Sequence, residues 1–189
     1  DKIRIIPNGI DISRFTAIER LPREGVPGHV GFVGRVVPIK DVKTFIKSCK
    51  IIVDALPGTR ISIAGPVDED PVYFKECQSQ VRLLGLEDAV TFTGRVNVLE
   101  LYAELDVVVL TSISEAQPLV ILEANCCGIP CVATEVGSCR ELLYGRTPRD
   151  IQIGQSGYVP PLSDPRATAA AVIRLLSNSD AARQMGENG

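Results

Sequence analysis

Two acidic and two basic residues have the types and spacing needed to bind a charged ligand rich in hydroxyl groups. Glu115 and Glu123 lie eight positions apart, and a carboxylate of this kind can accept two hydrogen bonds from a vicinal diol. Arg35 and Lys40 lie close together earlier in the chain, and fixed cations offset the negative charge of a phosphate group. A diol and a phosphate together indicate a nucleotide.

Residues 106–136 predict a strand, a loop, a helix and a second strand that would position the two acids. Residues 106–110 form an apolar, β-branched run typical of a buried parallel strand. Residues 111–117 are mostly small and polar, which predicts a loop, and Pro118 suits the first helical position. Residues 131–133 return as a buried strand. Glu115 would then lie where open α/β sheets bind ligands, at the carboxyl end of a strand.

The helix that begins near residue 118 has two further features. Leu119, Leu122 and Cys126 recur at helical spacing, which predicts that they form its apolar face. Gly128 is a typical residue just beyond a helix end. Glu123 lies on this apolar helix and needs a partner if it is buried. The start of the helix offers free N–H groups and a positive dipole end, both suited to phosphate.

The two cations follow another predicted strand, residues 30–33. Gly34 comes next, where glycine permits a tight turn and close approach of a ligand. Arg35 and Lys40 would therefore lie at the carboxyl end of that strand.

Strands and helices alternate along the whole chain, which predicts an α/β fold: a doubly wound, parallel, Rossmann-like sheet. Ser138 and Glu141 match a capping box at the start of one helix. Residues 145–154 are largely polar and predict a loop. The expected strands are 30–33, 60–64, 90–93, 106–110, 131–133 and 156–159, and the expected helices are 41–56, 72–84, 99–105, 138–144, 165–176 and the one that starts at residue 118.

Composition narrows the class of protein. The 189 residues are a single-domain length, and the net charge of −3 favours neither nucleic acid nor an anionic membrane surface as a partner. The sole histidine, His29, precedes a strand, which predicts a surface role. The spacing of the six cysteines matches no common zinc site, so we expect small buried thiols without metal or disulfide. They are Cys49, Cys77, Cys126, Cys127, Cys131 and Cys139.

Several segments resemble one family from about residue 6 onward, in that family's order. Glu115 and Glu123, followed by Gly128 and Pro130, resemble the E-x(7)-E motif of the retaining GT-B glycosyltransferases of family 4. The segment GRVVPIKD at 34–41 resembles that family's G-R-x-x-x-x-K pattern. The resemblance implies the C-terminal, donor-binding domain of a two-domain enzyme that transfers a sugar from a nucleotide-diphosphate sugar.

The resemblance also assigns roles to residues. Arg35 and Lys40, with Gly34 beside them, would hold the departing diphosphate, aided by the N–H groups of Leu119 and Val120. Glu123 would hold the ribose and Glu115 the donor sugar, and the backbone at Arg95 and Val96 would meet the base. Glu115, Arg35 and Lys40 are thus the expected catalytic residues. No metal or other cofactor is expected.

The segments SEAQPLVILEA and VGSCRELLYG are most similar to the PelF branch, the cytosolic glycosyltransferases of Pel exopolysaccharide synthesis. This implies a cytoplasmic enzyme that transfers a hexosyl unit from a UDP-sugar, either UDP-glucose or a UDP-N-acetylhexosamine, to a growing polysaccharide. The expected partners are the N-terminal acceptor domain and a membrane-bound polysaccharide synthase complex.

The resemblance also divides the chain into two parts. Residues 1–16 would be an interdomain linker segment and residues 17–189 the nucleotide-sugar-binding domain, truncated at both ends of a longer enzyme. Alone it would transfer little or nothing.

Other functions remain open. An NAD-binding domain needs G-x-G-x-x-G after the first strand and an acid after the second, and neither Gly31, Gly34 and Arg35 nor residues 64–66 supply them. A non-catalytic module that binds a nucleotide or a partner protein is a second alternative. A GT-B sugar epimerase is a third, although the segment GRVVPIKD favours transfer.

Overall fold

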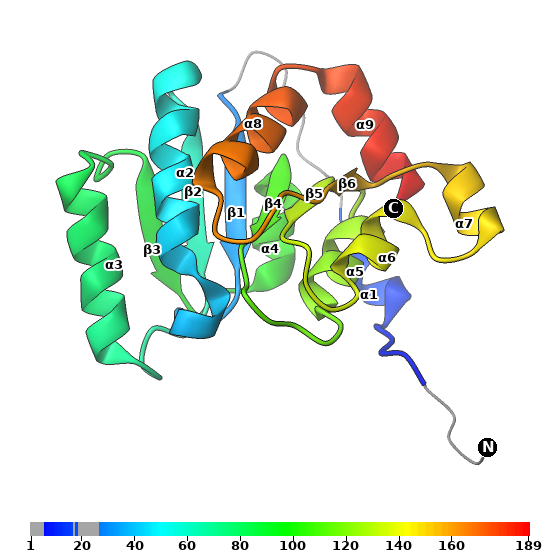
Figure 1. The fold of residues 1–189 in the computed structure, drawn as a ribbon, viewed down its shortest axis with the longest axis horizontal. Coiled ribbons are helices and arrows are strands. Elements are labelled where there is room, and N and C mark those ends of the chain that lie inside the picture. The colour runs from blue at the N-terminus through cyan, green and yellow to red at the C-terminus, as the bar shows by residue number, and fades with distance from the viewer. Residues whose placement is uncertain (1–5, 17, 19–26) are drawn as a thin grey trace.

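The chain folds around one six-stranded sheet in which all neighbouring strands are parallel. The computed structural model describes residues 6–16, 18 and 27–189. The strand order is β3-β2-β1-β4-β5-β6, which confirms the predicted doubly wound sheet (Figure 1). The strands are β1 His29–Val33, β2 Arg60–Ala64, β3 Val90–Gly94, β4 Val107–Leu110, β5 Cys131–Ala133 and β6 Gly157–Tyr158.

Helices cover both faces of this sheet (Figure 1). They are α1 Ile12–Thr16, α2 Val42–Ala55, α3 Pro71–Leu83, α4 Val98–Glu104, α5 Leu119–Cys126, α6 Cys139–Tyr144, α7 Pro148–Ile153, α8 Pro165–Leu176 and α9 Ser179–Asn188, with a 3-10 turn, η1, at Pro38–Lys40. The long helices begin at side-chain caps. Asp41 accepts a hydrogen bond from the backbone N of Thr44 at 3.3 Å, and Asp164 accepts one from that of Ala167 at 2.9 Å.

Two apolar cores lie on opposite faces of the sheet. Alternate residues of β4 belong to different cores, since Val107 and Val109 pack with α2, α3, α8 and α9, whereas Val108 and Leu110 pack with α1, α4, α5 and α6. Side chains alternate between the two faces of a strand, so a fully apolar strand such as β4 must be covered on both faces. This explains why β4 lies in the middle of the sheet, with apolar side chains covering both of its faces.

One predicted loop of the chain differs from the structure. Residues 145–154 are not all loop, because α7 begins there with a capping box in which Thr147 and Asp150 bond each other's backbone N–H groups. The sequence does contain the signal, a Thr-Pro start with an acid three residues after the cap. The sequence also predicts a strand end at residues 3–6 and a loop at residues 17–28, and both segments lie mostly outside the described residues.

Helix α1 was not predicted, and it lies within the segment expected to be a linker. Its residue Phe15 is 5% exposed and packs in the same apolar core as residues of α4 and α5. Among the residues described, no helix combines the length and apolar character needed to cross a membrane.

Candidate functional site

The direction in which the strand order proceeds reverses between β1 and β4. The chain leaves β1 toward β2 on one side and leaves β4 toward β5 on the other, so the two following loops diverge. This is the topological switch point at which open α/β sheets bind ligands. Loop 34–41 follows β1 and loop 111–118 follows β4, and both hold predicted site residues.

Lys40 and Glu115 meet at this switch point, although they come from different loops. The Nζ of Lys40 donates to Oε1 of Glu115 at 2.5 Å, and the hydroxyl of Ser112 donates to the same oxygen at 2.7 Å. The side chains of Lys40 and Glu115 are 16% and 13% exposed. Oε2 of Glu115 has no donor among the described residues. The pair therefore presents an ammonium group and one uncommitted carboxylate oxygen.

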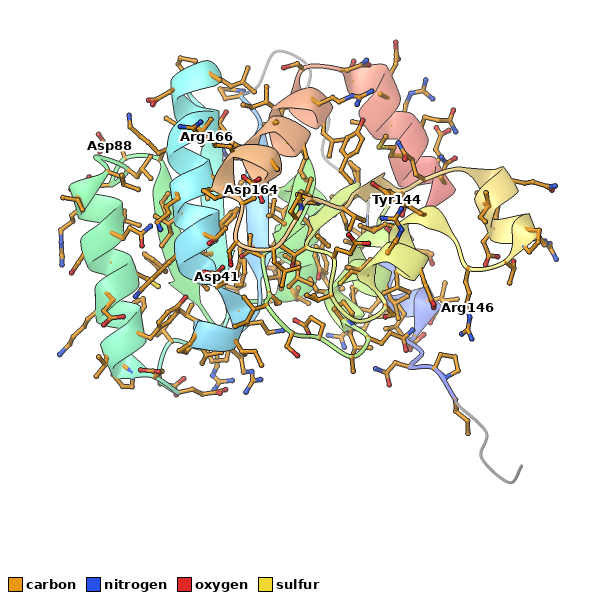
Figure 2. The ribbon with its side chains drawn as sticks, in the orientation of Figure 1. Asp41, Asp88, Tyr144, Arg146, Asp164 and Arg166 are labelled. Carbon is orange, nitrogen blue, oxygen red and sulfur yellow. The ribbon has the colours of Figure 1, made fainter. Side chains whose placement is uncertain are left out.

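The backbone that presents Lys40 is fixed by the loop after β4. The buried hydroxyl of Thr111 donates to the backbone oxygens of Lys40 and Asp41, at 3.1 and 3.0 Å. Asp41 adopts a left-handed conformation with φ of 45°, which is uncommon outside glycine. Figure 2 labels it at the start of α2. The N–H of Ile113 donates to the carbonyl of Ile39 at 2.9 Å. These contacts tie the backbone at Lys40 to the loop that carries Glu115.

The loop carrying Glu115 is braced from the other side by the loop after β5. Gly137 has φ of 50°, and a Cβ there would lie 2.2 Å from the carbonyl oxygen of Glu115, so only glycine fits. The backbone N of Ser138 donates to the carbonyl of Ala116 at 3.0 Å. The predicted capping box of Ser138 with Glu141 is wrong, because the Ser138 side chain makes no cap bond. The start of α6 is instead hydrogen-bonded to the loop that carries Glu115.

Helix α5 points its N-terminus at this loop. Pro118 is the cap residue and not the first helical residue, as its extended backbone shows. The backbone N–H groups of Leu119 and Val120 have no acceptor within the described part of the chain. They are thus free to bind an anion at the positive end of the helix.

The predicted apolar face of α5 is wrong. Leu119 is 43% exposed, and the buried residues are Ile121 and Ala124. The helix is apolar almost all round, so spacing alone did not identify the buried side.

Glu123 has a protein partner. Its Oε2 accepts a hydrogen bond from the hydroxyl of Tyr102 on α4 at 2.9 Å, which provides the pairing that an acid on an apolar helix requires. Sequence reasoning missed Tyr102, because nothing local links it to Glu123.

Arg35 does not join the Lys40–Glu115 pair. Its guanidinium donates to Glu69 after β2 at 2.9 Å, and the two side chains are 53% and 41% exposed. Exposed ion pairs of this kind contribute about 0–1 kcal/mol, so Arg35 can leave Glu69 at little cost. Gly34 lies outside the left-handed region, and a Cβ there would make only ordinary contacts. The fold itself therefore does not require glycine at position 34.

Gly65 is the glycine that this part of the fold requires. It has φ of 140°, and a Cβ there would lie 2.1 Å from the carbonyl oxygen of Gly34. The loops after β1 and β2 thus pack directly against each other.

Arg95 and Val96 follow β3, at the edge of the sheet and two strands away from β1. Arg95 is largely exposed, and its Nη2 lies 3.6 Å from Oδ1 of Asp68. Val96 is 44% exposed. Their predicted contact with a base stays a prediction.

The predicted surface role of His29 is wrong. His29 is the first residue of β1 and is 4% exposed, with Nε2 at 2.8 Å from the Ser62 hydroxyl. The parallel register sets His29 beside Arg60, and residues two apart on a strand share a face. Ser62 is therefore brought to the imidazole.

The six cysteines form no disulfide with one another; five of them are buried and Cys126 is half-buried. Burial raises the pKa of the Cys77 and Cys139 thiols to about 11. In the described ranges, no cluster of histidine, cysteine or acidic side chains is arranged to hold a metal ion.

The amino-acid sequence of this chain is similar to those of known glycosyltransferases. A family model described as "Glycosyl transferases group 1" matches residues 27–178. The D-inositol 3-phosphate glycosyltransferase of Arthrobacter sp. strain FB24 is 34% identical over 160 residues, covering 78% of this chain and 37% of that protein. The N-acetyl-alpha-D-glucosaminyl L-malate synthase of Bacillus anthracis is 40% identical over 108 residues, covering 57% and 26%.

A solved structure resembles nearly the whole chain. HepE from Anabaena, determined in complex with UDP-glucose, superposes with a TM-score of 0.83 at 25% identity, covering 98% of this chain and 50% of that one. The chain spans less than half the length of the two glycosyltransferase-family relatives named above.

Proposed function

Because the chain belongs to the glycosyl transferases group 1 family, we propose that it forms the nucleotide-sugar-binding domain of a retaining glycosyltransferase. The donor is a UDP-sugar. The observation that supports this most strongly is the Lys40–Glu115 pair, 2.5 Å apart, at the switch point between β1 and β4. Glu115 lies on the loop that leads into the N-terminus of α5, so one cation, one carboxylate and the N–H donors of the helix belong to neighbouring parts of the site.

In this proposal the site at this switch point stabilises the departing diphosphate. An ammonium group has three donors, so Lys40 can keep its bond to Glu115 and still donate to phosphate. The N–H groups of Leu119 and Val120 add two donors, and Arg35 can turn from Glu69 to the ligand. Negative charge grows on the leaving diphosphate as the glycosidic bond breaks, and donors fixed before the reaction stabilise that charge without reorganising.

The two acids take different parts of the donor. Glu115 retains one free oxygen beside the Lys40 bond, suited to a hydroxyl of the donor sugar. Glu123 has its Oε2 bonded to Tyr102 and no donor to its Oε1 among the described residues, which suits a ribose hydroxyl. The acids stand eight positions apart on the loop and helix that flank the diphosphate site, so sugar and ribose can lie on opposite sides of the phosphates.

We propose further that the enzyme belongs to family 4 and to the PelF-like branch, on the segments SEAQPLVILEA and VGSCRELLYG. It transfers a hexosyl unit to a growing exopolysaccharide. Residues 1–16 then form the linker segment and residues 17–189 the donor domain of a longer enzyme. Its acceptor domain and a membrane-bound synthase complex would be the partners.

Calorimetric titration of this chain with UDP, GDP, ADP and NAD tests the proposal. UDP is expected to bind most tightly, and a chelator is expected to leave its affinity unchanged, because Lys40 and the helix amides supply the positive charge. Tighter binding of NAD than of UDP would refute the family-based function. Loss of UDP binding on chelation would refute the metal-free site.

A further inference from the structure

The orientation of Glu123 is set by a side chain from another helix. Glu123 is half-buried on α5, and its Oε2 accepts from the hydroxyl of Tyr102 on α4 at 2.9 Å. A glutamate carboxylate otherwise turns freely about its last bond. The contact with Tyr102 fixes one oxygen and leaves the other to face a ligand.

Tyr102 is suited to hold a carboxylate permanently. It is fully buried on α4, and burial together with the negative charge of Glu123 raises its pKa. The phenol therefore stays protonated across the physiological range and acts as a donor to Glu123. A buried donor that fits one acceptor gives a defined geometry, because leaving either group unpaired is costly.

Helix α1 backs the ring of Tyr102. The Phe15 and Tyr102 rings meet edge to face, with centroids 6.2 Å apart and an interplanar angle of 60°. Phe15 is itself buried, and the thiol of Cys127 donates to its carbonyl oxygen at 3.8 Å. Phe15 thus contacts both α4 and the end of α5, the two helices that carry Tyr102 and Glu123.

We propose that Tyr102, backed by Phe15, is a positioning residue that orients Glu123 toward the ribose hydroxyls of the donor nucleotide. This rests on the proposed function. It goes beyond that function by adding two residues that touch no ligand, and by linking α1 to ribose recognition. Because α1 lies in the segment that we expect to join two domains, a shift of α1 would alter how tightly the ribose is held.

The test compares UDP with 2′,3′-dideoxy-UDP, which lacks both ribose hydroxyls. The chain should bind UDP at least about tenfold more tightly than the dideoxy analogue, the effect of a charge-assisted hydrogen bond. Tyr102→Phe, which removes one buried oxygen and keeps the ring, should reduce this ratio about three- to tenfold. Its affinity for the dideoxy analogue should not change. Phe15→Leu should also reduce this ratio, by a smaller factor than Tyr102→Phe.

Tyr144→Phe is the matched control. The Tyr144 hydroxyl, labelled in Figure 2 on α6, accepts a hydrogen bond from the backbone N of Val159 at 3.1 Å. This variant also removes one tyrosine hydroxyl and its hydrogen bond, but away from Glu123, so it should leave the ratio unchanged. A purely structural role for Tyr102 would lower both affinities together and leave the ratio intact, and that result would overturn the inference.

A double-variant cycle adds an independent readout. In Glu123→Gln the ribose contact is already weakened, so Tyr102→Phe should add little to the loss of discrimination. A full additional loss in that background would also overturn the inference. If the unaltered chain binds UDP but does not distinguish it from dideoxy-UDP, the role of Glu123 fails while nucleotide binding stands. If it does not bind UDP, the proposed function fails as well.

Discussion

Replacing Lys40 with alanine is expected to weaken UDP binding roughly ten- to hundredfold while leaving uridine binding nearly unchanged. The ammonium group contacts Glu115 at the switch point between β1 and β4, where the phosphates would bind. A hydrogen bond to a charged group is worth about 1.5–3 kcal/mol, and each 1.4 kcal/mol is about tenfold in affinity. Uridine has no phosphates, so calorimetry with both ligands isolates this contribution.

Two further variants make the Lys40 experiment specific. Lys47→Ala removes the same charge from the exposed side of α2, where Lys47 has no ion-pair partner among the described residues, and should have little effect. Lys40→Ala also removes the cation that pairs with Glu115, whose remaining negative charge would itself repel phosphate. In Lys40→Ala/Glu115→Ala that repulsion is gone, so affinity should stay low if Lys40 binds the phosphates directly. Recovery of affinity in the double variant would contradict that role.

Replacing Glu115 with glutamine is expected to lower sugar transfer by the whole enzyme about a hundredfold or more. Misplacing a reacting group by about 1 Å can cost 10²-fold in rate, and Glu115 would hold the donor sugar. UDP lacks that sugar, so its affinity should remain the same or rise, because Lys40 loses a competing negative charge. Initial rates and UDP titrations on the same preparation measure both quantities.

Glu135→Gln is the control for this change. Glu135 lies on the neighbouring loop after β5, is exposed and pairs with Arg140 at 3.1 Å, so transfer should be unaffected. A Glu115→Gln enzyme that keeps full activity, or one that loses UDP affinity as strongly as Lys40→Ala, would show that Glu115 does not face the sugar.

Much of the fold could be predicted because its signals are local. The largely apolar run Arg60–Ala64 predicted β2, and the Asp-Pro pair at residues 164–165 predicted the start of α8. The structure shows both elements with the predicted limits. Helix α7 was missed because six residues are too few to show a period, although Thr147 and Asp150 form its cap. The capping box predicted for Ser138 and Glu141 did not form, and the Ser138 backbone N–H, from which Glu141 would accept, donates instead to Ala116 on another loop. No local pattern encodes that contact.

The candidate site was predicted only in part, for the same physical reason. Residue types at strand ends indicated Lys40 and Glu115, and the sheet brings them together although they lie 75 positions apart. The partners of Arg35 and Glu123 were not predictable. The contact between Arg35 and Glu69 depends on how the loops after β1 and β2 pack, and that between Tyr102 and Glu123 on how α4 packs against α5. Both depend on tertiary packing and not on spacing.

A crystal structure of this chain with UDP bound would be the most direct measurement. The diphosphate is expected at the switch point between β1 and β4, within hydrogen-bond distance of the Nζ of Lys40 and the backbone N–H groups of Leu119 and Val120, with the ribose on Glu123. UDP bound elsewhere, for example in the groove beside β2 and β3 lined by Arg60, Ser62 and Thr91, would contradict this placement.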